Sequence, residues 1–339
     1  MPDWLLILRP SGGSFHRSRM LLGALAFGLP MGYQVFHQQH LAAGMMGFAI
    51  LATIMMDMGG SRRQRLGSML FGNILIITAA SISLSINANL LLWFAGIILL
   101  VTLIGASLSA GFALDLLLRM VASAYLVGYP GSVISGSILP YYLSGAVMTI
   151  VLALCVAPRI NNPISLKVPP HWHNDYQQLR QGQFAGATFG LLLAIACALS
   201  FFFAQKLHFT APNVAAICTL MVFRPEPKRT SSTIWQRLMG VLLASLIAWA
   251  FVFEIQSYWA LVALAAITGA LVPIAFANGL MYVAAVTTFL IYLILALLGI
   301  QGHAAEISAE NRIFETLLGA AIAIIFAMIF RSLKPETGP

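Results

Sequence analysis

Apolar runs follow one another along most of this chain, and most of them are close to the length that crosses a lipid bilayer as a helix. The sequence has 339 residues, of which 60% are hydrophobic and 8% are charged, whereas a soluble domain carries about 25% charged residues. Roughly 20 apolar residues in a helix span the hydrocarbon core. The runs do not alternate with polar residues as barrel strands do. The sequence therefore predicts an all-α, polytopic membrane protein.

We place about 12 transmembrane helices, in two sets of six that a polar linker separates. The predicted spans are residues 20–36, 41–57, 66–84, 88–105, 108–126, 136–157, 183–204, 211–223, 238–253, 258–275, 278–299 and 312–330. The expected domains are a cytoplasmic N-terminal segment (1–19), a first six-helix half (20–157), a cytoplasmic linker (158–182), a second six-helix half (183–331) and a cytoplasmic tail (332–339).

The distribution of Lys and Arg predicts the orientation. If the N-terminus is inside and the spans alternate, fifteen basic residues fall inside, and only Lys206 and Arg312 fall outside. This is the bias that the positive-inside rule describes. It explains the net charge of +8 without nucleic acid as a partner. We therefore expect a multi-pass protein of the bacterial inner membrane, in contact with the lipid bilayer and with both termini in the cytoplasm.

The two halves look related by an internal repeat. Gln64-Arg65-Leu66 aligns with Gln236-Arg237-Leu238, and Leu143-Ser144-Gly145-Ala146 aligns with Leu317-Leu318-Gly319-Ala320, at an offset of about 170 residues. Because each half has an even number of spans, the halves would run parallel, with an axis along the membrane normal. Such duplications commonly place a pathway near the midplane. The alternative is a duplication with no pathway between the halves.

Asp115 and Arg119 are ionisable residues inside the fifth predicted span. They are four residues apart, so they share one helix face and can pair. Ionisable residues in the membrane are costly and by default indicate a substrate or ion pathway. On that interpretation Asp115 takes up a proton and releases Arg119 to bind an organic anion, which couples proton uptake to anion export. The alternative is a permanent ion pair that locks the helix against a neighbour.

Uncharged polar residues form a stripe on the eleventh predicted span, which corresponds to the fifth. The stripe contains Asn278, Tyr282, Thr287 and Thr288, and Asn73 in the third span is a similar case. Hydroxyl and amide groups could line an anion path. They could equally form hydrogen bonds that hold helices together. We keep both interpretations for these five residues.

Glu315 and Arg312 stand at the outer mouth of the last predicted span. Glu315 is a second candidate proton acceptor. The alternative is a solvated carboxylate at the membrane interface, where the start of the helix favours its charged form.

The sequence contains no recognisable catalytic or nucleotide-binding motif. We find no phosphate loop, dinucleotide glycine motif, nucleophile elbow or zinc-protease motif. The cysteines lie singly in apolar runs, and their spacing matches no metal or redox pattern. We therefore expect no enzymatic activity, no cofactor and no metal site.

An Arg recurs with a Gly or Thr three, four or seven residues later: Arg65 and Gly72 in the third span, Arg237 and Gly240 in the ninth, and Arg312, Thr316 and Gly319 in the last. The tenth span begins with Tyr258 and Trp259. This motif and the start of the tenth span resemble the fusaric acid resistance family. That superfamily includes bacterial aromatic acid exporters and is distantly similar to plant aluminium-activated malate channels. This chain resembles a short form that lacks the large cytoplasmic domains of the larger exporters.

The resemblance implies a transporter that uses the proton-motive force to export small aromatic carboxylic acids or related toxic compounds. Such an antiporter exchanges the organic anion for protons and works with a periplasmic membrane-fusion adaptor protein. Two alternatives stay open: a passive organic-anion channel and a scaffold subunit that transports nothing. The sequence does not decide the substrate, and a homo-oligomer is one of the states it allows.

Overall fold

The structure is a computed structural model, and it describes residues 17–57, 61–108, 112–129, 139–156, 172–182, 184–225, 227–252 and 254–333. The predicted N-terminal segment, most of the linker and the C-terminal tail thus lie largely outside the described residues. Over these ranges the chain is helical and contains no strand.

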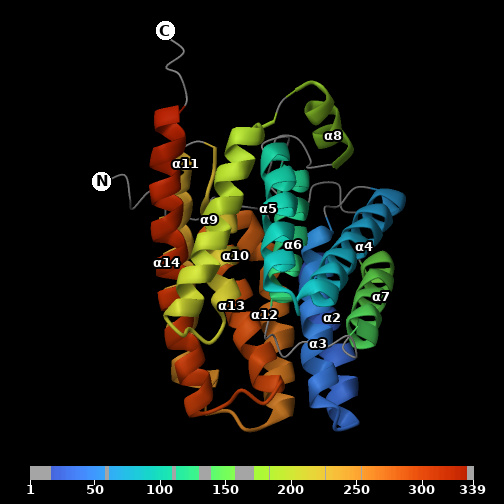
Figure 1. Cartoon of the computed structure of the whole chain (residues 1–339). Coiled ribbons are helices and arrows are strands. Elements are labelled where there is room, and N and C mark those ends of the chain that lie inside the picture. The colour runs from blue at the N-terminus through green and yellow to red at the C-terminus, as the bar shows by residue number, and fades with distance from the viewer. Residues whose placement is uncertain are drawn as a thin grey trace, which may run out of the picture. The chain divides into compact units, whose positions relative to one another are not determined.

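Figure 1 shows the helices in chain order. They are α2 (Arg17–Phe36), α3 (His40–Met56), α4 (Arg62–Ile86), α5 (Leu90–Ser107), α6 (Phe112–Val127), α7 (Leu139–Val156), α8 (Trp172–Arg180), α9 (Ala187–Lys206), α10 (Pro212–Val222), α11 (Pro227–Ile247), α12 (Tyr258–Asn278), α13 (Leu280–Leu297) and α14 (His303–Leu333). A π-helical turn, η2 (Ala248–Val252), continues α11.

Every predicted span coincides with one of these helices, and α8 is an additional helix in the linker. Among the described residues, eight helices are long and apolar enough to cross a membrane, while α3 and α10 are shorter apolar helices. The prediction of an all-α polytopic membrane protein is therefore confirmed. The number of spans stays a prediction.

Two helices begin well before their apolar runs. α11 starts at Pro227 and α14 at His303, whereas the runs start near residues 238 and 312. Proline is tolerated in the first turn of a helix because its missing N–H would have no partner there. Glu306 in the first turn of α14 complements the positive end of the helix dipole. An apolar run therefore marks the lipid-compatible part of a helix but not its first residue.

The chain divides into two compact units, each of which combines segments from both predicted halves. Unit 1 comprises Met1–Ile74, Ser135–Pro170 and Gln236–Glu310, and unit 2 comprises Leu75–Ile134, His171–Trp235 and Asn311–Pro339. The predicted boundaries between the two halves describe the sequence repeat, and they stay a prediction.

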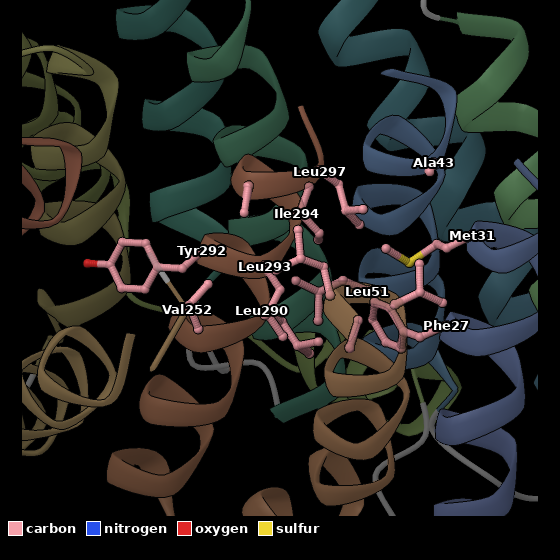
Figure 2. Close-up of a cluster of buried hydrophobic side chains, with 14 of the residues drawn as sticks. Phe27, Met31, Ala43, Leu51, Val252, Leu290, Tyr292, Leu293, Ile294 and Leu297 are labelled. Carbon is pink, nitrogen blue, oxygen red and sulfur yellow. The ribbon is translucent and has the colours of Figure 1, made fainter. Parts of the chain in front are cut away.

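In unit 1, α2 packs against α12, and α3 packs against α2, α7 and α13. Figure 2 shows the apolar core that these helices share, with Phe27, Met31, Leu290 and Leu293 among its members. Burial of such side chains contributes roughly 1.5–3 kcal/mol each where water is the alternative. Between helices inside a bilayer, close packing and hydrogen bonds carry more of the stabilisation.

In unit 2, α5 packs against α9, and α10 packs against α9 and α6. Trp93 on α5 is fully buried, and its indole N–H donates to the hydroxyl of Ser83 at 2.9 Å. The ring of Phe201 on α9 lies 4.7 Å from that of Trp93. The indole N–H, which would be costly to leave without a partner, is thus satisfied inside an apolar cluster.

Close glycine contacts between helices occur in both units. Gly23 on α2 touches the backbone at Gly269 on α12 in unit 1, and Gly190 on α9 touches the backbone at Gly105 on α5 in unit 2. A Cβ on any of the four glycines would collide with its neighbour. Small residues of this kind allow transmembrane helices to approach closely.

Candidate functional site

The candidate site in unit 2 is built around the C-terminal end of α10, where an arginine from α6 binds the last carbonyl groups. Nη1 of Arg119 donates to the carbonyl oxygens of Leu220 and Phe223, and Nη2 donates to that of Phe223 at 3.3 Å. Phe223 is the C-cap of α10. A cation at a helix C-terminus is favourable because the exposed carbonyl groups give that end a partial negative charge.

Asp115 lies between two arginines in this site. Its Oδ1 accepts from Nε of Arg119 at 2.9 Å, and its Oδ2 accepts from Nη1 of Arg224. The side chains of Arg119, Asp115 and Arg224 are 2%, 16% and 24% exposed, respectively. Among the described residues, one carboxylate thus faces two guanidinium groups, so these three side chains carry one excess positive charge in a poorly hydrated place.

The pairing of Asp115 with Arg119 follows from their four-residue spacing, but Arg224 was missed. It lies in a basic segment whose sequence suggests only an orientation signal. Arg224 directly follows Phe223, the residue that ends the apolar run of α10. A basic residue in that position is a signal for a helix C-terminus, and it could have connected Arg224 to this site.

The linker helix α8 fixes the start of α6 and was also not foreseen. Oδ2 of Asp175 accepts from the backbone N–H of Leu114 at 2.8 Å, and Asp175 is buried. Leu114 is the residue before Asp115, in the first turn of α6. A carboxylate satisfies an N–H group there that has no partner within its own helix. Asp175 therefore helps to position the turn that presents Asp115.

Glu315 lies at the opposite end of α10, and its burial does not fit the alternative of a solvated carboxylate. It is 1% exposed, and its Oε1 accepts from the backbone N–H of Ala211, the N-cap of α10, at 3.0 Å. Because α14 begins at His303, Glu315 lies well inside that helix rather than at its start. The helix terminus that favours a negative charge here belongs to α10. Whether Glu315 accepts a proton during function stays a prediction.

Two further residues lie near Glu315. Arg312 is half-buried on the same helix. Tyr129 follows the end of α6, and burial together with the carboxylate of Glu315 raises the pKa of Tyr129 above its ordinary value. The phenol therefore keeps its proton at neutral pH.

The polar stripe of the eleventh predicted span lies in unit 1, whereas Asp115, Arg119, Arg312 and Glu315 lie in unit 2. In the stripe, Thr287 donates to the carbonyl of Val283 at 2.7 Å, and Asn278 donates to that of Ile274 at 2.8 Å. Thr288 is buried and Tyr282 is half-buried. These bonds of Thr287 and Asn278 stay within their own helices, and a role in an anion path stays a prediction.

Asn73 connects three helices of unit 1. Its Nδ2 donates to the hydroxyl of Thr53 on α3 at 3.0 Å, and its Oδ1 accepts from the hydroxyl of Tyr142 on α7 at 3.2 Å. Nδ2 also donates to the carbonyl of Met69 on α4. This geometry fits the interpretation of Asn73 as a residue that holds helices together.

The motif residues of α14 bring this helix against α10. The carbonyl of Gly319 accepts from the hydroxyl of Thr219 at 3.0 Å, and a Cβ at Gly319 would collide with the backbone at Ala215. The carbonyl of Thr316 accepts from the thiol of Cys218 at 3.4 Å. Glycine at position 319 is therefore required by the close approach of the two backbones.

The remaining motif residues lie in unit 1 and serve several contacts. Gly240 on α11 packs closely against the carbonyl of Met281 on α13. Tyr258 stacks on His40 with ring centroids 3.6 Å apart, whereas Trp259 is largely exposed.

Arg65 and Gly72 on α4 are buried, and Arg237 on α11 is half-buried. Within the described ranges, no three His, Cys, Asp or Glu side chains gather in a way that could hold a metal ion.

The apolar helices define a multi-pass, α-helical membrane protein. The family model of fusaric acid resistance protein-like proteins matches residues 195–326, a segment that includes α10 and most of α14. The family resemblance predicted from the sequence is thereby confirmed. No curated protein and no solved structure matches the chain.

Proposed function

We propose that this protein is a secondary transporter that uses the proton-motive force to export small aromatic carboxylic acids. The family match and the apolar helices indicate a membrane protein of the transporter type. The substrate class, the coupling to protons and the outward direction are our proposal, which the resemblance to aromatic acid exporters supports. We place the protein in the bacterial inner membrane with cytoplasmic termini, because of the asymmetric distribution of Lys and Arg.

The observation that carries the proposal is the position of Asp115 between Arg119 and Arg224. When Asp115 takes up a proton, it stops competing for the guanidinium groups, and a substrate carboxylate binds in its place. Arg224 is the more exposed of the two arginines, so we assign the incoming carboxylate to Arg224. Arg119 keeps its bonds to the end of α10. One anion then still balances two arginines, so no additional charge is left without a counterion.

The direction of export depends on the order of release. The proton reaches Asp115 from the periplasm and leaves to the cytoplasm while the carboxylate is bound. The ionised Asp115 then competes for Arg224 and expels the substrate to the periplasm. Alternating exposure of the site to the two sides enforces this order, as in other transporters built from repeats. In both units the first span of one predicted half makes a close glycine contact with the fourth span of the other, which supports our proposal of an internal repeat.

Transport of benzoate into energised inside-out vesicles tests the proposal. We expect that wild-type protein accumulates benzoate, and that a protonophore or Asp115→Asn reduces the initial rate by tenfold or more. Glu306→Gln is the matched control, because it also neutralises a carboxylate but at an exposed position. Benzoate uptake that persists without a proton gradient and follows only the membrane voltage would instead identify a passive channel.

The same experiment separates a role of Asp115 in transport from a purely structural role, whereas a scaffold that transports nothing would give no benzoate uptake even in the wild type. On our proposal, Asp115→Asn lowers benzoate flux at unchanged protein abundance. If Asp115 only locks α6 in place, the variant would lose thermal stability, and flux per folded molecule would equal that of the wild type. We also propose a periplasmic membrane-fusion adaptor as the partner of the exporter, and a neighbouring gene that encodes a one-span adaptor would support this partner.

A further inference from the structure

A second cluster of one carboxylate and two arginines lies in unit 1, outside the site described above. Arg65 on α4 is fully buried, and its Nε and Nη2 donate to the two oxygens of Asp57 at 2.8 and 2.7 Å. Nη2 of Arg19 on α2 donates to the backbone carbonyl of Asp57 at 3.2 Å. Asp57 is the C-cap of α3, so the cluster gathers the ends of three helices.

Asp57 occupies only one of the two binding edges of the Arg65 guanidinium group. An arginine can receive one carboxylate on the edge formed by Nε and Nη2 and another on the edge formed by Nη1 and Nη2. Asp57 takes the first edge. Nη1, on the second edge, is buried and has no hydrogen-bond partner among the residues that the structure describes. Leaving a buried donor of a charged group without a partner costs free energy, and an anion on this edge would remove that cost.

The electrostatic surroundings favour an anion. Among the side chains of the cluster that the structure describes, Arg19 and Arg65 carry two positive charges and Asp57 one negative charge, and all three residues are at least nine-tenths buried. The described helices α2, α3, α4 and α7 contain no other acidic residue. Arg62 and Arg63, in the first turn of α4, add positive charge at the surface. An arriving anion would thus meet an excess of positive charge from several directions.

The cluster resembles the candidate site of unit 2 in composition. In both clusters a carboxylate binds an arginine through its side chain, and an arginine binds the C-cap carbonyl of a short helix, Asp57 of α3 or Phe223 of α10. The two clusters differ in which guanidinium nitrogens of the central arginine already bind an acceptor. Both η nitrogens of Arg119 already bind carbonyl groups, whereas Nη1 of Arg65 does not.

We propose that Arg65, with Arg19 beside it, forms a second binding site, which takes one small carboxylate anion on the unoccupied edge of its guanidinium group. Binding at this edge does not require Asp57 to leave. The identity of the anion as an aromatic monocarboxylate rests on the proposed function, but the binding itself does not depend on transport. Arg65 is also the first arginine of the recurring motif, so the proposal gives that residue a role beyond packing.

Binding of benzoate to the purified full-length chain in lipid nanodiscs tests this proposal. The measurements are made in the Arg224→Gln background, so that the site at Asp115 does not contribute. We expect benzoate to bind by isothermal titration and to raise Tm. Arg65→Lys keeps the positive charge but removes the second edge, and we expect it to weaken binding roughly 10- to 100-fold. Thr53→Val, a buried substitution next to Asn73, is the matched control and should leave binding unchanged.

Asp57→Asn keeps the test decisive if Arg65→Lys does not fold. It removes the competing negative charge and leaves Arg65 intact, so benzoate should bind more tightly, by about tenfold. The proposed binding site would be overturned if Arg65→Lys bound benzoate as tightly as the Arg224→Gln protein. It would also be overturned if Asp57→Asn left the affinity for benzoate unchanged. Chloride that stabilises the protein as much as benzoate would overturn the carboxylate assignment. Loss of flux in vesicles with binding retained would contradict only the proposed function.

Discussion

Arg119 is the residue on which most of the unit 2 site depends, because it joins α6 to the end of α10 and also holds Asp115. Its guanidinium group is fully buried and uses Nε, Nη1 and Nη2. Removing one partner of a buried ion pair is usually more damaging than replacing both, since it leaves an uncompensated charge. The same arrangement therefore serves stability as well as the proposed exchange of carboxylates.

We expect Arg119→Gln to lower the free energy of unfolding by about 3–5 kcal/mol, the cost of breaking a buried pair from one side. Arg119→Lys keeps the positive charge but loses the planar guanidinium group, and it should lower the free energy of unfolding by less. Thermal or denaturant unfolding of the purified protein measures both effects. Arg63→Gln, at an exposed position, should stay within about 0.5 kcal/mol of the wild type. If Arg119→Gln and Arg63→Gln lowered the free energy of unfolding by similar amounts, the role of Arg119 would be contradicted.

Sequence reasoning found the parts of this site that local spacing reveals. Asp115 and Arg119 are four residues apart on one helix, so their pairing follows from helix geometry. Arg224 reaches Asp115 across 109 residues of sequence, and no local pattern predicts such a contact. Glu315 was found as an ionisable residue, but its burial depends on α10, which packs against α14 through Gly319.

At the scale of elements, α10 is a short helix with a charged side chain at each end. Glu315 binds at its N-terminus and Arg119 at its C-terminus. Both charges oppose the partial charge of the terminus that they contact, which stabilises a helix by roughly 0.3–1 kcal/mol at each end, and by up to about 2 kcal/mol in partly buried places. With 11 residues, α10 would be marginal as an isolated helix, so these contacts and its packing determine its stability.

The polar linker helix α8 provides the clearest test at this scale. Asp175→Ala removes the carboxylate that receives the N–H of Leu114, and losing such a cap costs about 0.5–2 kcal/mol. Asp175→Asn keeps an acceptor oxygen and should cost less. In unfolding measurements, the free energy of unfolding should be highest for the wild type, lower for Asp175→Asn and lowest for Asp175→Ala. Two variants of equal stability would show that Asp175 does not support α6 through this bond.

The elements differ in how far the sequence determines them. The apolar runs located twelve helices because length and hydrophobicity directly reflect the bilayer. The first residues of α11 and α14 were missed because the polar turns before each apolar run carry no hydrophobic signal. The linker helix α8 has little hydrophobic signal, and its position depends on a contact with α6 that only the tertiary structure provides.

At the scale of the whole molecule, each compact unit contains helices from both predicted halves. Close glycine contacts join α2 with α12 in unit 1 and α9 with α5 in unit 2. Under the proposed repeat, the first span of each half thus packs against the fourth span of the other. A sequence alignment between halves can indicate the duplication, but it does not tell which half supplies the packing partner of each helix.

The proposed exchange moves one proton inward for each carboxylate that moves outward, and it can be followed directly through the lumenal pH of inside-out proteoliposomes during benzoate uptake. A trapped pH-sensitive dye reports the pH, and empty liposomes serve as the control for passive permeation of benzoic acid. We predict that the wild type makes the lumen more alkaline than that of empty liposomes, and that Asp115→Asn abolishes the difference. A lumen more acidic than that of empty liposomes would show that proton and benzoate move together, which would contradict the exchange.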